Sequence, residues 1–178
     1  MKKLLIFLCV AVMLLTSCGQ DVGIIGGADG PTKIYVADGS EVDTLKMVRI
    51  DGNLYYETGR DSDAIYTIGR VSGDILDRTD GSSIPQNESE TNFPAYAYII
   101  VDEETVALLE GDDCEEFKKL PDSVDASKYS YALKVEVDSL VDKEYIILAN
   151  APYVTKAEIE EAEKGNNDSI YIIAENND

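Results

Sequence analysis

The chain of 178 residues contains no histidine, no tryptophan and only three cysteines. Without histidine it cannot form a Ser-His-Asp or Cys-His catalytic system, nor a metal site with imidazole ligands. Basic residues are also scarce, because 15 lysines and arginines stand against 35 acidic residues. The resulting net charge of −20 excludes nucleic acid as a partner, since a surface that binds phosphates must be basic.

The amino-terminal segment has the three parts of a secretory signal. Lys2 and Lys3 precede an apolar stretch over residues 4–15, and a short polar zone follows. At 1.5 Å per residue, a helix of about 12 residues spans only ~18 Å, well short of the ~30 Å hydrocarbon core of a bilayer. This segment therefore predicts export rather than a permanent transmembrane helix.

The end of this segment resembles the lipobox of bacterial lipoproteins, in which Leu15, Ser17 and Cys18 stand at the matching positions. The resemblance implies that residues 1–17 are a signal peptide and that Cys18 carries a diacylglycerol. Residues 18–31 would then be the lipidated cysteine and a tether, on the outer, extracytoplasmic face of the cell membrane. The alternative is ordinary secretion, with Cys18 an incidental residue near the cleavage site.

Cysteine use limits the chemistry of the remaining chain. Cys9 would leave with the signal and Cys18 would be acylated, so Cys114 alone remains. No intramolecular disulfide can then form, and we expect Cys114 to be partly buried and inert. Residues 32–178 are long enough for a single domain with a sizeable core, with a second boundary conceivable near residues 121–128.

Short runs rich in tyrosine, valine and isoleucine alternate with clusters of turn residues, which predicts strands. Asp51-Gly52 between two such runs predicts a hairpin over residues 47–57 with a type I′ turn. Residues 81–92 are polar and are expected to be a loop. The predicted strands are 33–37, 45–50, 54–58, 64–70, 74–76, 95–101, 106–110, 131–137, 145–149 and 169–174, and residues 115–120 are expected to form a short strand or a helical turn.

One helix is predicted, over residues 156–164. Thr155 and Glu158 have the spacing of a capping box, and Gly165 stands where the helix should end. Its apolar face is thin, so we expect it on the surface beside the final strand. The fold class is therefore mainly β or α+β, with antiparallel sheets in two layers and one short helix near the C-terminus. The eleven tyrosines fit either ordinary sheet packing or a binding surface.

Residues 23–32, Gly-Ile-Ile-Gly-Gly-Ala-Asp-Gly-Pro-Thr, resemble a motif of the β subunit of sodium-translocating decarboxylases. In that family the aspartate that matches Asp29 is implicated in sodium handling. The chain lacks the multiple membrane spans of such a pump, so we do not expect that activity. A compact glycine turn, a cation contact at Asp29 and a recognition role remain as interpretations.

A second resemblance rests on Ile-Asp-Gly-Asn-Leu-Tyr-Tyr-Glu-Thr-Gly at residues 50–59, Ile84-Pro85, and Asn92-Phe93. These segments are similar to an extracytoplasmic domain family of Gram-positive bacteria, over residues 47–117. Some members of that family sit beside membrane peptidase or regulatory modules. The resemblance implies an architecture and a location but no chemistry, because the family has no agreed activity.

Carboxylates are the remaining candidates for a site. We predict no metal site and no cofactor, because no cluster has the spacing of a calcium-binding loop. Weak binding of divalent cations that relieves self-repulsion stays open. The clusters are Asp61 with Asp63; Asp102, Glu103 and Glu104; Glu110 with Asp112 and Asp113; and Glu160, Glu161 and Glu163.

These observations favour a membrane-anchored extracytoplasmic lipoprotein that serves as a binding or interaction module, with a membrane or cell-wall protein as its partner. The first alternative is an accessory or sensor subunit of a membrane peptidase or transporter. An enzyme is less favoured, because no nucleophile with a base can be named and no catalytic residue is predicted. Hydrolysis by paired carboxylates, or by serine with lysine, remains the form that such an activity could take.

Overall fold

The computed structural model describes residues 34–35, 41–79, 81–137 and 143–173. The predicted signal peptide, Cys18, the tether and the motif at residues 23–32 lie outside the described residues. No helix within the described part of the chain is long and apolar enough to cross a membrane.

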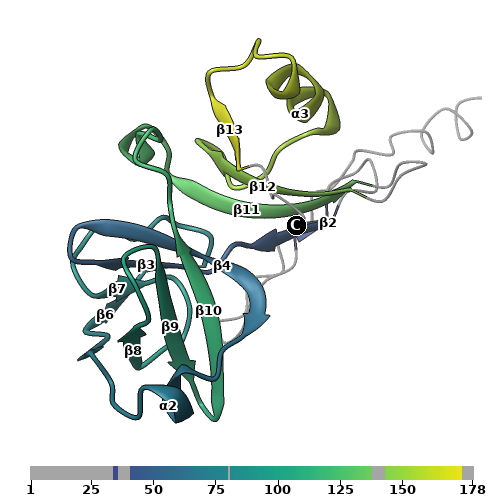
Figure 1. Cartoon of the computed structure of the whole chain (residues 1–178). Helices are drawn as coiled ribbons and strands as arrows, with labels where there is room; N and C mark the ends of the chain where they lie inside the picture. Colours follow the sequence, from purple (N-terminus) through teal and green to yellow (C-terminus); the bar gives the residue numbers. More distant parts are fainter. Residues whose placement is uncertain (1–33, 36–40, 80, 138–142, 174–178) are drawn as a thin grey trace, which may run out of the picture.

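The described residues form two sheets, drawn in Figure 1. Sheet A is antiparallel throughout, and its strands lie in the order β1 (Ile34–Tyr35), β2 (Glu41–Thr44), β11 (Tyr131–Val137), β12 (Lys143–Ala149) and β13 (Ile170–Ile173). Sheet B has the order β5 (Gly73–Asp74), β8 (Ala97–Ile100), β9 (Thr105–Glu110), β10 (Asp113–Lys119), β4 (Asn53–Asp61), β3 (Met47–Ile50), β7 (Glu90–Thr91) and β6 (Asp77–Arg78). The predicted β-rich class in antiparallel sheets is confirmed, except that β6 pairs with β7 in parallel.

Sheet A is the middle layer of the molecule, with helix α3 (Lys156–Glu163) on one side and sheet B on the other (Figure 1). Because side chains alternate along a strand, β12 supplies Ile147 to the core beneath α3 and Ile146 with Leu148 to the core between the sheets. That second core also takes Leu45, Met47, Leu54, Ile84 and Leu120. Val124 and Ala126, in the segment where a boundary was conceivable, pack against it.

The predicted hairpin is confirmed as β3 and β4, joined by a two-residue turn. Asp51 has φ 51° and Gly52 has φ 78°, which are the positive values that a type I′ turn requires. The carboxylate of Glu88 accepts hydrogen bonds from both turn amides, at 2.6 Å from Asp51 and 3.0 Å from Gly52. The turn is therefore stabilised by the side chain of Glu88 as well as by the backbone preference of its own two residues.

The polar segment 81–92, expected to be a loop, contains a short strand and several buried side chains. Ser89, Glu90, Thr91 and Asn92 are buried, and Glu90–Thr91 forms strand β7 beside β3. The side chain of Asn92 accepts from the N–H of Met47 and donates to the carbonyl of Leu45. We call residues 84–93 the strap, because its polar side chains and short strand bind the edge of β3.

The strand predicted at residues 64–70 is wrong, because Ala64–Thr67 forms the single-turn helix α2. The Asp63 carbonyl accepts hydrogen bonds from the N–H groups of Tyr66 and Thr67, and Gly69 then leaves the helical region at φ 71°. Ala64 is buried against sheet B while Tyr66 is exposed, which a strand with alternating faces would not allow.

Helix α3 is confirmed, one residue shorter than the predicted 156–164. Thr155 Oγ1 accepts from the N–H of Glu158, and the Glu158 carboxylate accepts from the N–H of Thr155, which completes the capping box. Gly165 follows the helix at φ 74°, a value that glycine tolerates best. Ile159 is the buried residue of this helix, which lies beside β13 as expected.

Candidate functional site

A charged cluster lies at the junction of the two sheets, around Lys46. Its Nζ atom donates to Glu110 at 3.0 Å and to both oxygens of Glu115 at 2.8 and 2.9 Å. The same ammonium group lies 5.2 Å from the centre of the Phe93 ring. Burial lowers the pKa of Lys46, but the hydrogen bonds to Glu115 and Glu110 outweigh burial and raise that pKa above its ordinary value.

Glu57 belongs to the same junction and is the most buried carboxylate there, with 11% of its side chain exposed. It accepts from the N–H of Lys46 at 2.9 Å and lies 3.5 Å from the Nζ atom of Lys134. Burial raises the pKa of Glu57 despite both lysines. Each carboxylate in this cluster faces a lysine, so the arrangement holds the sheets together and offers no paired acid and base.

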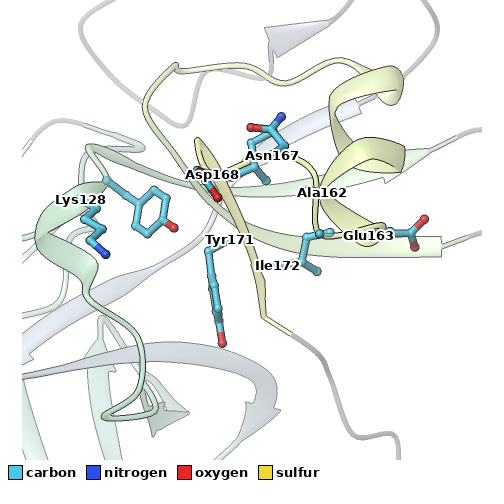
Figure 2. A pocket seen from close by; sticks show the side chains of 10 residues that line it. Lys128, Ala162, Glu163, Asn167, Asp168, Tyr171 and Ile172 are labelled. Atoms are coloured by element: carbon cyan, nitrogen blue, oxygen red, sulfur yellow. The ribbon is translucent and has the colours of Figure 1, made fainter.

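A groove of about 960 Å³ lies beside β13, shown in Figure 2. We call it the β13 groove. Its walls come from three places: strand β13, the end of α3 with the loop after it, and the end of the 3-10 helix η1 (Ala126–Lys128). The lining residues are Lys128, Tyr129, Ala162, Glu163, Gly165, Asn167, Asp168, Ile170, Tyr171 and Ile172.

The β13 groove runs along the edge of sheet A. Ile170, Tyr171 and Ile172 are consecutive, so their side chains leave the strand on alternate faces, yet all three line one groove. Figure 2 shows Tyr171 and Ile172 on opposite sides of the strand. Ile172 packs with the core beneath α3, whereas Tyr171 packs with the core between the sheets. The groove therefore passes around the strand edge from one layer to the other.

The walls of the groove combine aromatic surface with polar groups of both signs. Tyr129 and Tyr171 are half-buried, and burial raises the pKa of Tyr129, with Asp168 adding to the effect. The Tyr129 hydroxyl therefore stays protonated at neutral pH and can donate a hydrogen bond. Lys128 supplies the cation and lies 3.8 Å from Asp125, while Glu163 accepts from the hydroxyl of Tyr145 at 2.9 Å.

A second, smaller pocket of about 390 Å³ lies beside α2, at the far end of sheet B. Its lining includes the acidic side chains of Asp61, Asp63 and Glu116, together with Tyr66 and Val101. Asp63 is the residue before α2, and its side chain makes no capping hydrogen bond. The pocket thus brings one predicted carboxylate pair, Asp61 and Asp63, next to an exposed aromatic ring.

The other predicted carboxylates are spread over the molecule. Glu110 is bound to Lys46, Glu163 lies at the β13 groove, and Asp102 accepts from the N–H of Glu104 in a surface turn. No group of three or more acidic or cysteine side chains that could hold a metal ion occurs within the described ranges. Cys114 is partly buried beside Ala64, Ile99 and Ala107, as the sequence suggests.

No protein-family model matches the chain, and no curated protein or solved structure matches it either. The resemblances to a lipoprotein signal, to the decarboxylase motif and to the Gram-positive domain family therefore stay predictions.

Apart from Glu163, which belongs to a predicted carboxylate cluster, sequence reasoning did not find the residues of the β13 groove. Lys128 ends the 3-10 helix η1, Asn167 and Asp168 lie in the loop before β13, and Tyr171 has the pattern of an ordinary strand residue. The groove exists because β13 is the last strand of its sheet and because η1 and α3 flank it. That sheet order depends on contacts between residues far apart in the chain, which no local pattern encodes.

Proposed function

We propose that the chain is a membrane-anchored extracytoplasmic lipoprotein that works as a binding module, and that its β13 groove takes an extended segment of a partner protein. Leu15, Ser17 and Cys18 support the anchor. Two acyl chains on one cysteine would hold the protein stably at the membrane, where a single chain would not. The acidic body, with its net charge of −20, would then stand away from an anionic lipid surface.

The observation that carries the binding proposal is the position of β13. Among the described strands it has a neighbour, β12, on one side only. An edge strand presents alternate N–H and carbonyl groups to solvent, and an added strand can pair with them. Here that edge lies in a groove with side chains on both of its faces, so an incoming strand would bury its own side chains as well.

A partner of positive or neutral charge fits this groove better than a second copy of the chain does. A second copy would bring another net charge of −20 to the contact. Asp168 lies on the groove wall near Tyr129 and could pair with a lysine or arginine of the incoming strand. Alternate apolar side chains of that strand would contact Tyr171 on one face and Ile172 on the other.

The proposal is tested with random dodecapeptides displayed on phage and selected on the full-length chain. Strand addition predicts that the selected peptides alternate apolar and polar residues and carry lysine or arginine. The best peptide is then synthesised twice, once unmodified and once with alternate backbone amides methylated. Methylation removes the N–H donors without altering side chains, so binding that uses the strand edge should fall by at least about tenfold.

A matched pair of variants locates the contact. Ile172→Lys places a charge on the groove wall and should abolish binding of the unmodified peptide, whereas Tyr153→Lys changes an exposed residue that does not line the groove. Thermal melts confirm that both variants fold. Equal binding of the methylated and unmodified peptides, or equal loss in both variants, would contradict the proposal.

A further inference from the structure

The pairing of β12 with its two neighbours determines which backbone groups β13 turns to its open edge. The carbonyl of Ala149 accepts from the N–H of the residue that precedes β11, so Ala149 turns its backbone groups toward that strand. Backbone groups point to alternate sides along a strand, so Leu148 turns toward β13, where it pairs with Tyr171. Tyr171 is therefore bonded to β12, while Ile170 and Ile172 present their N–H and carbonyl groups at the open edge.

The two faces of this edge differ in chemistry. Ile170 and Ile172 pack with the apolar core beneath α3, where Ala162 of that helix joins them. Tyr171 packs on the opposite face together with Tyr129, and the hydroxyl groups of both tyrosines make that face polar. Side chains of an added strand also alternate between the faces. Such a strand therefore fits with apolar residues opposite Ile170 and Ile172 and with polar residues on the tyrosine face.

The charged side chains of the groove differ in whether they already have partners. Lys128 is paired with Asp125 at 3.8 Å, and Glu163 accepts from a tyrosine hydroxyl at 2.9 Å on the Ile172 side of the strand (Figure 2). The carboxylate of Asp168 has no hydrogen bond or ion pair within the described part of the chain. Asp168 raises the pKa of the Tyr129 hydroxyl, so it belongs to the tyrosine face. An incoming lysine or arginine on that face would find this carboxylate open.

The position of Asp168 gives the bound strand a direction. Asp168 lies shortly before the first residue of β13, Ile170. In antiparallel addition, this start of β13 lies opposite the C-terminal end of the incoming strand. The pairings of sheet A that the structure describes are all antiparallel, and antiparallel pairs are the more stable kind. A basic residue that reaches Asp168 therefore follows the apolar residues of the incoming segment.

We infer that the partner segment runs antiparallel to β13 and has the order apolar, polar, apolar, basic. The inference rests on the proposed function of the β13 groove and adds the direction and the register of the bound strand. The two apolar residues lie opposite Ile172 and Ile170, exchange backbone hydrogen bonds with them and cover the core beneath α3. The basic residue lies on the tyrosine face and pairs with Asp168.

The register is tested with peptides that carry valine, threonine, valine and lysine at their centre, between glycine and serine residues and with both ends capped. Titration calorimetry measures their affinity for the full-length chain. Methylation of the two valine amides should weaken binding by at least about tenfold, because these N–H groups face β13. Methylation of the threonine and lysine amides adds as many methyl groups where the N–H groups face away, so affinity should change by less than about twofold. Equal effects of the two methylations, or the opposite order, overturn the inferred register.

The direction is tested with the reversed peptide, which has the same composition with lysine before the other three residues. The forward peptide should bind at least about threefold more tightly, because only its lysine reaches Asp168 in antiparallel pairing. A nitroxide label placed after the lysine should broaden the amide NMR signal of Ser169 more than that of Ile173, and a label before the first valine should do the opposite. Equal binding of the reversed peptide, or the opposite pattern of broadening, overturns the inferred direction.

A pair of charge variants tests the contact with Asp168. Asp168→Asn should weaken binding of the forward peptide by about threefold and should not weaken binding of an analogue with norleucine in place of lysine. Asp112→Asn removes an exposed carboxylate that does not line the groove and should leave both affinities unchanged. Equal loss in the two variants means that the attraction is general and overturns the contact.

The failure of this inference is distinguishable from the failure of the proposed function. If no peptide binds, the strand-binding function of the β13 groove and the inferred register fall together. If peptides bind but their affinity does not depend on the methylated position or on the direction of the sequence, the groove still binds peptides and only the register and direction are overturned.

Discussion

The side-chain carbonyl of Asn92 accepts a hydrogen bond from the backbone N–H of Met47 at 2.8 Å, inside the core. The amide nitrogen of the same side chain donates to the carbonyl of Leu45 at 2.9 Å. One asparagine thus satisfies two backbone groups of another segment, as a neighbouring strand would. These two hydrogen bonds hold the strap beside β3. The polar side chain of Asn92 therefore bonds to buried backbone groups rather than to water.

Replacing Asn92 with alanine should lower the free energy of unfolding by about 2 to 4 kcal/mol, because two buried backbone groups lose their partners. Urea unfolding followed by circular dichroism measures the change. Asn150→Ala alters an exposed asparagine and should stay within about 0.5 kcal/mol of the parent chain. Equal stability of the two variants would mean that the strap does not depend on Asn92.

The positive φ of Gly52 in the first hairpin predicts that a β-branched residue at this position lowers the free energy of unfolding. Gly52→Val should destabilise the protein by about 1 kcal/mol or more, because valine is forced to φ 78°. A Cβ atom at this position would meet no other atom within 4 Å, so the cost comes from the backbone alone. Asn53→Val, one residue later at the start of β4, is the control and should cost less. A Gly52→Val variant as stable as the parent would rule out the turn.

The buried carboxylate of Glu57 predicts a dependence of stability on pH. Because its pKa is raised in the folded state, the folded protein binds this proton more readily than the unfolded chain does. Its contribution to stability is therefore complete below the ordinary pKa of 4.5 and is lost as the pH rises through the folded-state pKa. Glu57→Gln imitates the protonated form, so its stability relative to the parent should rise as the pH increases above 4.5.

Urea midpoints at several pH values provide this comparison. Glu103→Gln is the control, because Glu103 is exposed in a surface bend. A constant difference between Glu57→Gln and the parent would show that burial does not shift this group.

Helix α3 depends on its capping box. Thr155→Ala should cost about 1 kcal/mol, because the N–H of Glu158 loses its acceptor at the start of the helix. Thr155→Ser keeps the hydroxyl and should restore most of the lost stability. The readout is the thermal midpoint, and a serine variant as unstable as the alanine variant would assign the loss to packing of the threonine methyl group instead.

Local signals in the sequence were sufficient wherever neighbours along the chain decide the conformation. The Asp51-Gly52 turn and the capping box of Thr155 and Glu158 are of this kind, and both are confirmed. The helical turn at Ala64–Thr67 was not predicted, because its isoleucine, tyrosine and threonine favour a strand and contacts with Ile99 and Ala107 fix the helix. Strand β10 (Asp113–Lys119) was predicted only in part, since five of its seven residues are charged and only Cys114 and Phe117 are apolar.

The candidate sites were still harder to predict, because both lie where sheets end. Tyr171 and Tyr129 are 42 residues apart in the numbering and meet only through the pairing of β12 with β13. Tyr66 and Val101 meet through the attachment of α2 to sheet B. By contrast, the proposed anchor at Cys18 depends on adjacent residues alone, so the sequence predicts it without a fold.

The account depends most on that anchor, and membrane fractionation of cells that express the full-length chain tests it most directly. The parent chain and a Cys114→Ala control should sediment with membranes and incorporate labelled fatty acid. Cys18→Ala should lose the label and leave the membrane fraction. If Cys18→Ala stays with the membranes as the parent does, or if the parent carries no lipid, the proposal of a lipid-anchored binding module is contradicted.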